Sequence, residues 1–117
     1  MLKEFLEYLK HIHDECEFIL SVITSETKED DFFHDETLKR AVVRSLEIIG
    51  EASKKIPADH KLKWKAIGWK HMAGMRDKLI HDYMGVNYRI VWDVVKNKIP
   101  ELSIQIRDVI TLEENAK

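Results

Sequence analysis

The spacing of the apolar residues is the feature that most constrains the fold of this chain. In the first segment they recur at steps of one, three and four, at Leu2, Phe5, Leu6, Leu9, Ile12, Cys16, Ile19, Leu20 and Ile23. This period places them on one face of an amphipathic helix, with charged residues on the opposite face. The pattern predicts a helix over residues 2–24 and a loop over residues 24–31.

A second helical pattern follows this loop. We expect its N-cap at Asp31 or Asp35, because Asp side chains accept hydrogen bonds from the first turn of a helix. It is expected to end before Pro57, since the residue preceding a proline disfavours the helical region. Gly50 lies within the pattern, which points to a close helix–helix approach or to a ligand near the backbone. The lysine-rich residues 58–68 are expected to form a connection.

Three further helices are expected towards the C-terminus. The first covers residues 69–83, with Gly85 as its C-terminal cap. The second covers residues 88–97 and is capped by Asn87. The third begins around Pro100, which suits a first turn because its missing N–H is not needed there. Together these patterns predict an all-α fold, an up-and-down bundle of four main helices or five.

Length and composition limit the classes of protein that this chain can belong to. Its 117 residues suit one domain spanning residues 1–117, with residues 112–117 frayed. A net charge of -2 excludes a uniformly basic DNA-coating surface. The single Cys16, on the apolar stripe, excludes an intrachain disulfide and a Cys-based zinc cluster. No apolar run approaches the roughly 18 residues of a membrane span, and no signal peptide is recognisable, so we expect a cytoplasmic protein.

Positive charge is concentrated in the middle of the chain. Residues 54–78 hold eight basic side chains and two acidic ones. Such a local concentration can attract a polyanion although the whole molecule is acidic, and a solvated lysine-rich loop is an equally good interpretation. The candidate RNA contacts are Lys61, Lys63, Lys65, Lys70 and Lys78. Trp64 and Trp69 lie in the same segment, and Trp69 is expected in the core.

The third of these five helices carries the residues best suited to chemistry. At 100° per residue, Arg76 and Tyr83 share one edge of the helix, and Asp77 and His81 share the other. An arginine can bind a phosphate, and a histidine can transfer protons near neutral pH. Asp77 is placed to orient the imidazole of His81. These residue types suit metal-free cleavage of a phosphodiester, although by themselves they are also typical of a surface ion-pair network. No good metal site is visible.

Several segments resemble one known family. Residues 76–83 read RDKLIHDY and are similar to the R-x-x-x-x-H-x-Y signature of HepT-like toxins, small helical ribonucleases of the HEPN superfamily. Residues 69–76 read WKHMAGMR and resemble the lead-in to that signature. Residues 44–53 (RSLEIIGEAS) and 86–92 (VNYRIVW) resemble two further family segments. One departure is Asp77, where the family often has Asn.

The resemblance implies a specific function. The chain would be the toxin of a type VII toxin–antitoxin system and a metal-independent RNA endonuclease, with no cofactor. It would form a homodimer in which two copies of the R…H helix meet at a composite cleft. Arg76 and His81 would be the catalytic pair, and a minimal nucleotidyltransferase antitoxin would silence the enzyme by attaching AMP to Tyr83.

Two other interpretations remain open on the sequence alone. The chain is also compatible with a non-catalytic nucleotide-binding or regulatory subunit of a nucleotidyltransferase. A dimeric helical adaptor without any ligand is the third possibility. The presence of both Arg76 and His81 favours the nuclease, because a binding module has no need of a titrating histidine.

Overall fold

The computed structural model describes residues 4–81 and 85–116, with the backbone alone at Arg76, Leu79, Ile80 and His81. The described residues form helices and no strand. The helices are α1 (Glu4–Val22), α2 (Glu29–His34), α3 (Glu36–Lys54), α4 (Ala58–Lys63), α5 (Trp69–His81), α6 (Tyr88–Asn97) and α7 (Ile99–Asn115). None of them is long and apolar enough to cross a membrane.

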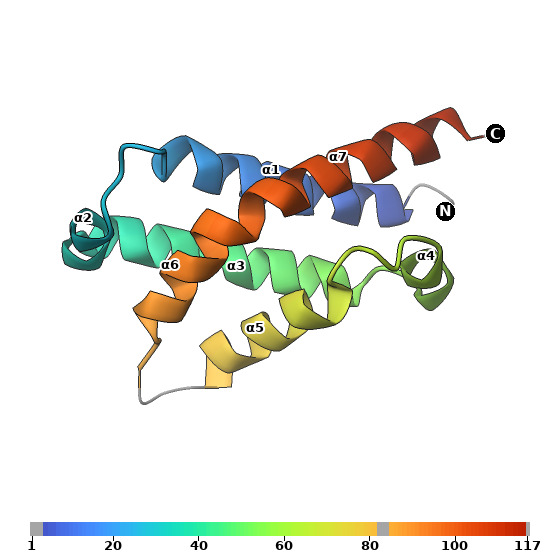
Figure 1. Ribbon diagram of the computed structural model, residues 1–117. Helices are drawn as coiled ribbons and strands as arrows, with labels where there is room; N and C mark the ends of the chain where they lie inside the picture. Colours follow the sequence, from blue (N-terminus) through green and yellow to red (C-terminus); the bar gives the residue numbers. More distant parts are fainter. Residues whose placement is uncertain (1–3, 82–84, 117) are drawn as a thin grey trace.

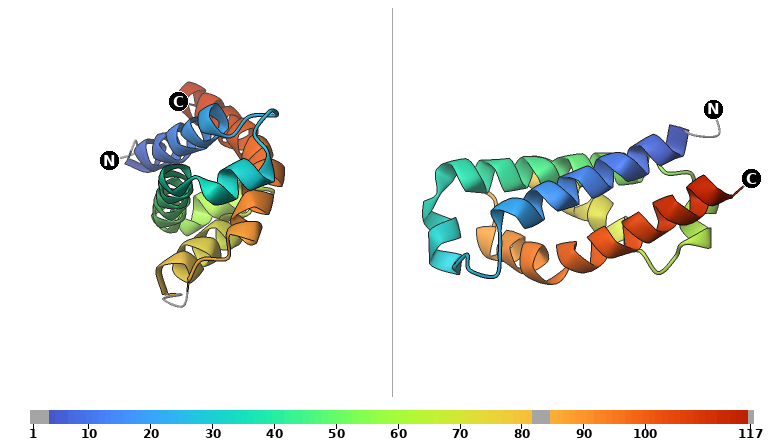
Figure 2. Two further views of the ribbon diagram at one scale, coloured as in Figure 1. Left: turned by 90° about the vertical axis from the view of Figure 1, so that its left-hand side faces the viewer. Right: turned by 90° about the horizontal axis from the view of Figure 1, so that it is seen from above.

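The long helices run alternately up and down the molecule (Figure 1). α3 lies at the centre, with α1 packed on one side and α5 on the other. α7 packs on α1. α6 leads into α7 after a short break, so that α6 and α7 together have the shape of one bent helix (Figure 2). The all-α, up-and-down prediction is therefore confirmed. The N- and C-terminal ends of the described chain lie at the same end of the bundle.

The predicted apolar stripes form one hydrophobic core. On α1 the buried positions are Leu6, Leu9, Ile12, Cys16 and Ile19, which the period of the sequence had selected. Cys16 is completely buried, and burial, with smaller contributions from Glu17 and Glu15, raises the pKa of its thiol to about 12. It therefore lies in the core, as its place on the apolar stripe predicts, and its thiol stays protonated at neutral pH.

A short helix replaces part of the loop expected over residues 24–31. α2 begins at Glu29, and its residue Phe32 is completely buried. Its ring centroid lies 5.4 Å from that of Trp92 and 6.2 Å from that of Tyr88, both on α6. Of the two N-caps considered for the following helix, the structure selects Asp35, whose carboxylate accepts a hydrogen bond from the backbone N–H of Leu38 at 2.9 Å.

The connection expected over residues 58–68 also contains a helix, α4. It is anchored from two sides at the end of the bundle that holds both termini. The ring of His60 stacks on Phe5 of α1 with 3.9 Å between centroids. Glu113 of α7, with only 8% of its side chain exposed, accepts hydrogen bonds from Trp64 Nε1 at 2.9 Å and from Lys63 Nζ at 3.1 Å.

The remaining helix boundaries follow local sequence signals. Asn87 caps α6 by accepting hydrogen bonds from the N–H groups of Arg89 and Ile90. Pro100 lies in the first turn of α7, as predicted, and its ring prevents α6 and α7 from forming one continuous helix. Gly85 has φ +123°, a conformation that side-chain-bearing residues rarely adopt. α7 continues to Asn115, so regular helix extends into the segment expected to fray.

The Glu113 contacts predict a pH-dependent effect of substitution. Burial raises the pKa of Glu113, but the hydrogen bonds from Trp64 and Lys63 outweigh it, and the pKa lies below its ordinary value of 4.5. Stability from the ionised carboxylate is thus present above pH 4.5 and is lost as the pH falls through the lowered pKa. Glu113→Gln keeps an acceptor for Trp64 and should lower the free energy of unfolding by about 1 kcal/mol at pH 7.

Urea denaturation at pH 7 and pH 3 measures this effect. The difference between wild type and Glu113→Gln should shrink at pH 3, because less of the wild-type carboxylate is ionised there than at pH 7. Glu114→Gln is the matched control, because Glu114 is exposed and pairs with the exposed Lys10, and it should change stability by only a few tenths of a kcal/mol. An equal loss for Glu113→Gln at both pH values would contradict this role of the carboxylate.

Candidate active site

α5 carries the residues predicted to do chemistry. Its first residue, Trp69, is 7% exposed, and its indole N–H donates to the carbonyl oxygen of Trp64 at 3.2 Å. The buried indole confirms the core position expected for Trp69 and fixes the start of the helix. Arg76 and His81 both belong to α5, and His81 ends it about 18 Å along the axis from Trp69. The side chains of Arg76 and His81, and the whole of Tyr83, lie outside the described residues.

An ion pair joins the middle of α5 to α3. Lys54 Nζ lies 2.5 Å from Asp77 Oδ1, and both side chains are partly exposed. Asp77 and His81 are four residues apart and therefore share one edge of the helix. The Lys54 contact shows that the Asp77 side chain faces the end of α3. Asp77 thus has a structural role that the sequence did not reveal, in addition to the role proposed for it towards His81.

The other side of α5 borders a groove of about 580 Å³. Its walls come from α3, α5, α6 and α7, and apolar side chains such as Met72, Met75, Ile90, Val94 and Leu102 line it. Met72 and Met75 are both only partly buried at this groove. α6 and α7 diverge from α5 on this side of the bundle (Figure 1), and Met72 packs, partly buried, against the hydrophobic core.

The predicted RNA-contacting lysines lie on two helices and in the segment between them. Lys61 and Lys63 belong to α4 and Lys65 follows it, at the end of the bundle where α5 begins. Lys63 is paired with Glu113 and lies 5.2 Å from the centre of the Trp64 ring, so its charge is partly neutralised. Lys70 and Lys78 lie eight residues apart on α5 and border the groove.

Two charged residues near these lysines were missed by sequence reasoning. Lys98, between α6 and α7, lies at the rim of the same groove as Lys70 and Lys78. Glu113 was assigned to a frayed tail and instead anchors α4. Neither has a local sequence signal, because each acquires its role through contacts between distant segments. In the described part of the chain, no three His, Cys, Asp or Glu side chains are grouped so as to hold a metal ion.

Comparison with known proteins agrees with this arrangement. The family described as "Ribonuclease HepT-like" matches residues 5–109. "Putative RNase TTE0752" of Caldanaerobacter subterraneus subsp. tengcongensis is 50% identical over 107 residues, covering 92% of this chain and 95% of that protein. "Probable ribonuclease HepT" of Thermococcus cleftensis is 47% identical over 102 residues, covering 87% and 92%.

A third relative, "Putative RNase MJ0127" of Methanocaldococcus jannaschii, is 43% identical over 109 residues, covering 93% of this chain and 84% of that protein. No solved structure matches the chain significantly. The family match spans every long helix from α1 to α7, and it includes the segment of α5 that carries Arg76 and His81. The chain therefore belongs to the HepT-like ribonuclease family.

Proposed function

We propose that this chain is a metal-independent RNA endonuclease and the toxin of a type VII toxin–antitoxin system, acting in the cytoplasm. The observation that carries the proposal is the Arg76–His81 pair on α5, within the residues that match the HepT-like ribonuclease family. The ribonuclease names of three relatives at 43% identity or more support the same reaction class.

The proposed reaction uses the RNA's own 2′-hydroxyl as nucleophile. His81 removes the hydroxyl proton, and the oxygen attacks the adjacent phosphorus. The bond from phosphorus to the 5′-oxygen breaks, that oxygen takes up a proton, and a 2′,3′-cyclic phosphate remains. Arg76 stabilises the negative charge that develops on the phosphoryl oxygens. Asp77, four residues before His81, supports the orientation of the imidazole.

The site is proposed to be completed by a second copy of the chain. The groove beside α5 supports this, because its lining leaves Met72 and Met75 in contact with solvent in a single chain. A two-fold axis passing close to α5 covers these apolar side chains and brings the two copies of Arg76 and His81 to one cleft. Lys70 and Lys78 at the groove rim, with Lys61 and Lys65 further along, then attract the RNA backbone. Lys63 contributes least, because Glu113 already pairs with it.

Control is proposed to act through Tyr83. A nucleotidyltransferase antitoxin attaches AMP to its hydroxyl, and each AMP adds a phosphodiester with about one negative charge at neutral pH. Tyr83 follows Arg76 by seven residues, nearly two helical turns, so the added phosphate lies where Arg76 otherwise holds the substrate phosphate. The adenosine occupies the cleft at the same time.

Substitution of the catalytic pair tests the proposed reaction. His81→Ala and Arg76→Ala should each lower the rate of cleavage of single-stranded RNA by about 100- to 10,000-fold. His34→Ala is a matched control, because His34 is exposed on α2 and bonds only locally, to the carbonyl of Asp30. Gel analysis of a labelled oligoribonucleotide measures all three, and products should carry a cyclic phosphate.

Excess EDTA should leave the wild-type rate unchanged, and DNA of the same sequence should survive. Cleavage that EDTA abolishes, and that both substitutions leave intact, would remove Arg76 and His81 from the mechanism. Binding of nucleotides without cleavage of any RNA would favour the regulatory-subunit interpretation.

Substitution of the tyrosine tests the proposed control. Tyr83→Phe removes the acceptor oxygen and keeps the ring, so this variant should cleave RNA like wild type and should resist silencing by the nucleotidyltransferase. Intact-mass spectra after incubation with ATP and that partner should show added AMP on wild type alone. Unmodified wild-type protein, or equal modification of Tyr83→Phe, would exclude Tyr83 as the control point.

A further inference from the structure

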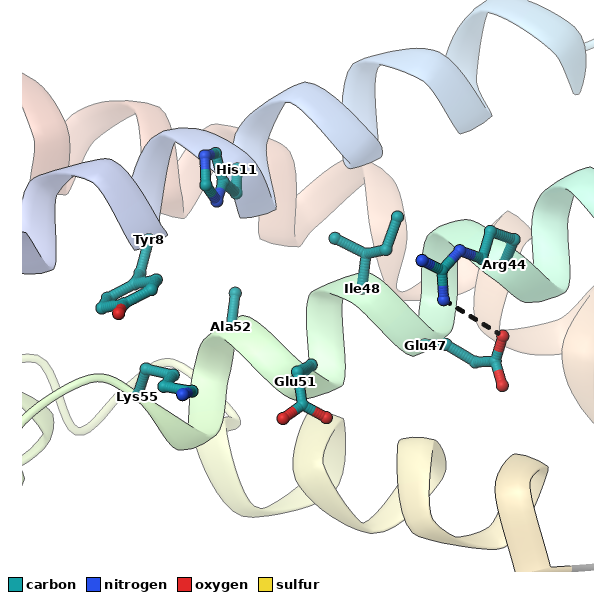
Figure 3. A pocket seen from close by; sticks show the side chains of 8 residues that line it. All are labelled: Tyr8, His11, Arg44, Glu47, Ile48, Glu51, Ala52 and Lys55. Carbon is teal, nitrogen blue, oxygen red and sulfur yellow. Dashed lines mark ion pairs between the residues drawn. The ribbon is translucent and has the colours of Figure 1, made fainter.

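A second, smaller cavity lies between α1 and α3, away from the groove beside α5. It measures about 210 Å³. Its lining comes from Tyr8 and His11 of α1, from Arg44, Glu47, Ile48, Glu51 and Ala52 of α3, and from Lys55, which caps the end of α3. Figure 3 shows Ile48 and Ala52 between the two helices and Tyr8 extending from α1 towards α3 above Lys55. Glu51 points away from α1, towards α5. The cavity therefore has an apolar floor and an aromatic wall.

Exposed cations stand at the two ends of this cavity. The side chain of Arg44 is 72% exposed, and its recorded ion pair, with Glu47 Oε1, is long at 4.0 Å. Lys55 is exposed and has no ion-pair partner among the described residues. Eleven residues separate the two, which is about 16 Å along α3. Both cations thus remain available to an anionic ligand.

This combination of groups matches a segment of single-stranded nucleic acid. Proteins bind such strands by stacking bases on aromatic side chains while cations follow the phosphates. A cavity of about 210 Å³ is smaller than the roughly 300 Å³ at which pockets for whole small-molecule ligands begin. It therefore suits one base of a longer strand better than a complete nucleotide cofactor.

The cavity also lies close enough to α5 for one RNA strand to contact both. Lys54, the neighbour of Lys55, forms the ion pair with Asp77, which is itself next to Arg76. The cavity and the catalytic half of α5 thus lie on two sides of α3, separated by one helix of about 10–12 Å diameter. A strand of RNA held at α5 can reach the cavity by crossing α3.

We infer that the α1–α3 cavity binds a base of the RNA substrate a few nucleotides from the cleavage position. Tyr8 stacks on the base, and Arg44 and Lys55 hold the flanking phosphates. The inference rests on the proposed ribonuclease function, because it assigns the cavity to the same RNA. It makes this face of the bundle part of the substrate site, in addition to the lysines that the sequence had selected.

Binding measured without cleavage tests the cavity separately from the catalytic proposal. The His81→Ala chain, bearing one further substitution, is titrated into a fluorescent single-stranded oligoribonucleotide, and anisotropy gives the dissociation constant. Arg44→Ala and Tyr8→Leu should each weaken binding about tenfold. Tyr8→Phe keeps the ring and should bind like the parent, which shows that the ring and not the hydroxyl is needed.

Arg40→Ala is the matched control for charge. Arg40 lies one turn before Arg44 on α3, is 81% exposed, and does not line the cavity. It should weaken binding less than twofold at the same salt concentration. Equal effects of Arg40→Ala and Arg44→Ala, no effect of Tyr8→Leu, or absence of any RNA binding would overturn the inference. If RNA binds with the expected pattern and the protein with His81 intact does not cleave it, the catalytic proposal fails and the cavity assignment stands.

Discussion

The packing of α5 against α3 is the contact on which the rest of the structure depends. Trp69 fixes the start of α5, and the Lys54–Asp77 ion pair fixes its middle. One edge of the helix is thereby turned towards α3, and the other borders the apolar groove. A helix held in this way has a defined orientation without being enclosed. That suits the catalytic role proposed for α5, which requires both a rigid support and access to a large substrate.

The partly covered side of α5 is the basis for proposing that two chains together build the active site. Met72 and Met75 are apolar, and both are only partly buried in the part of the chain that the structure describes. Covering them with a second copy releases water from apolar surface, which favours association. The lysines also differ in their surroundings. Lys70, Lys78 and Lys98 border the groove, whereas Lys63 is used to hold α4 on Glu113.

Features that depend on neighbouring residues could be predicted from the sequence. The long helices, the Asn87 cap, the position of Pro100 and the burial of Cys16 each arise from periodicity or from hydrogen bonds within a few residues. α2 and α4 could not be predicted in this way. Phe32 is buried against α6, and Trp64 is held by Glu113, more than forty residues away. Both short helices are stabilised by contacts that no local pattern contains.

The features of the candidate site likewise separate into those that the sequence predicted and those that it did not. The spacing of Arg76 and His81 on one helix, and the family to which the chain belongs, followed from the sequence. The Lys54–Asp77 ion pair, the groove at Met75 and the α1–α3 cavity did not, because each depends on how separate helices meet. The distribution of the lysines over α4, α5 and the segment between them was also invisible, since it depends on where each helix begins and ends.

The central claim is that two copies of α5 build one active site, and mixing inactive subunits tests it most directly. Arg76→Ala and His81→Ala chains are allowed to exchange subunits, and light scattering confirms that the mixture is dimeric. Each mixed dimer then holds one intact arginine and one intact histidine from different chains. The account predicts that the mixture regains RNA cleavage which neither variant shows alone. Mixed dimers that form and remain as inactive as the separate variants would contradict it.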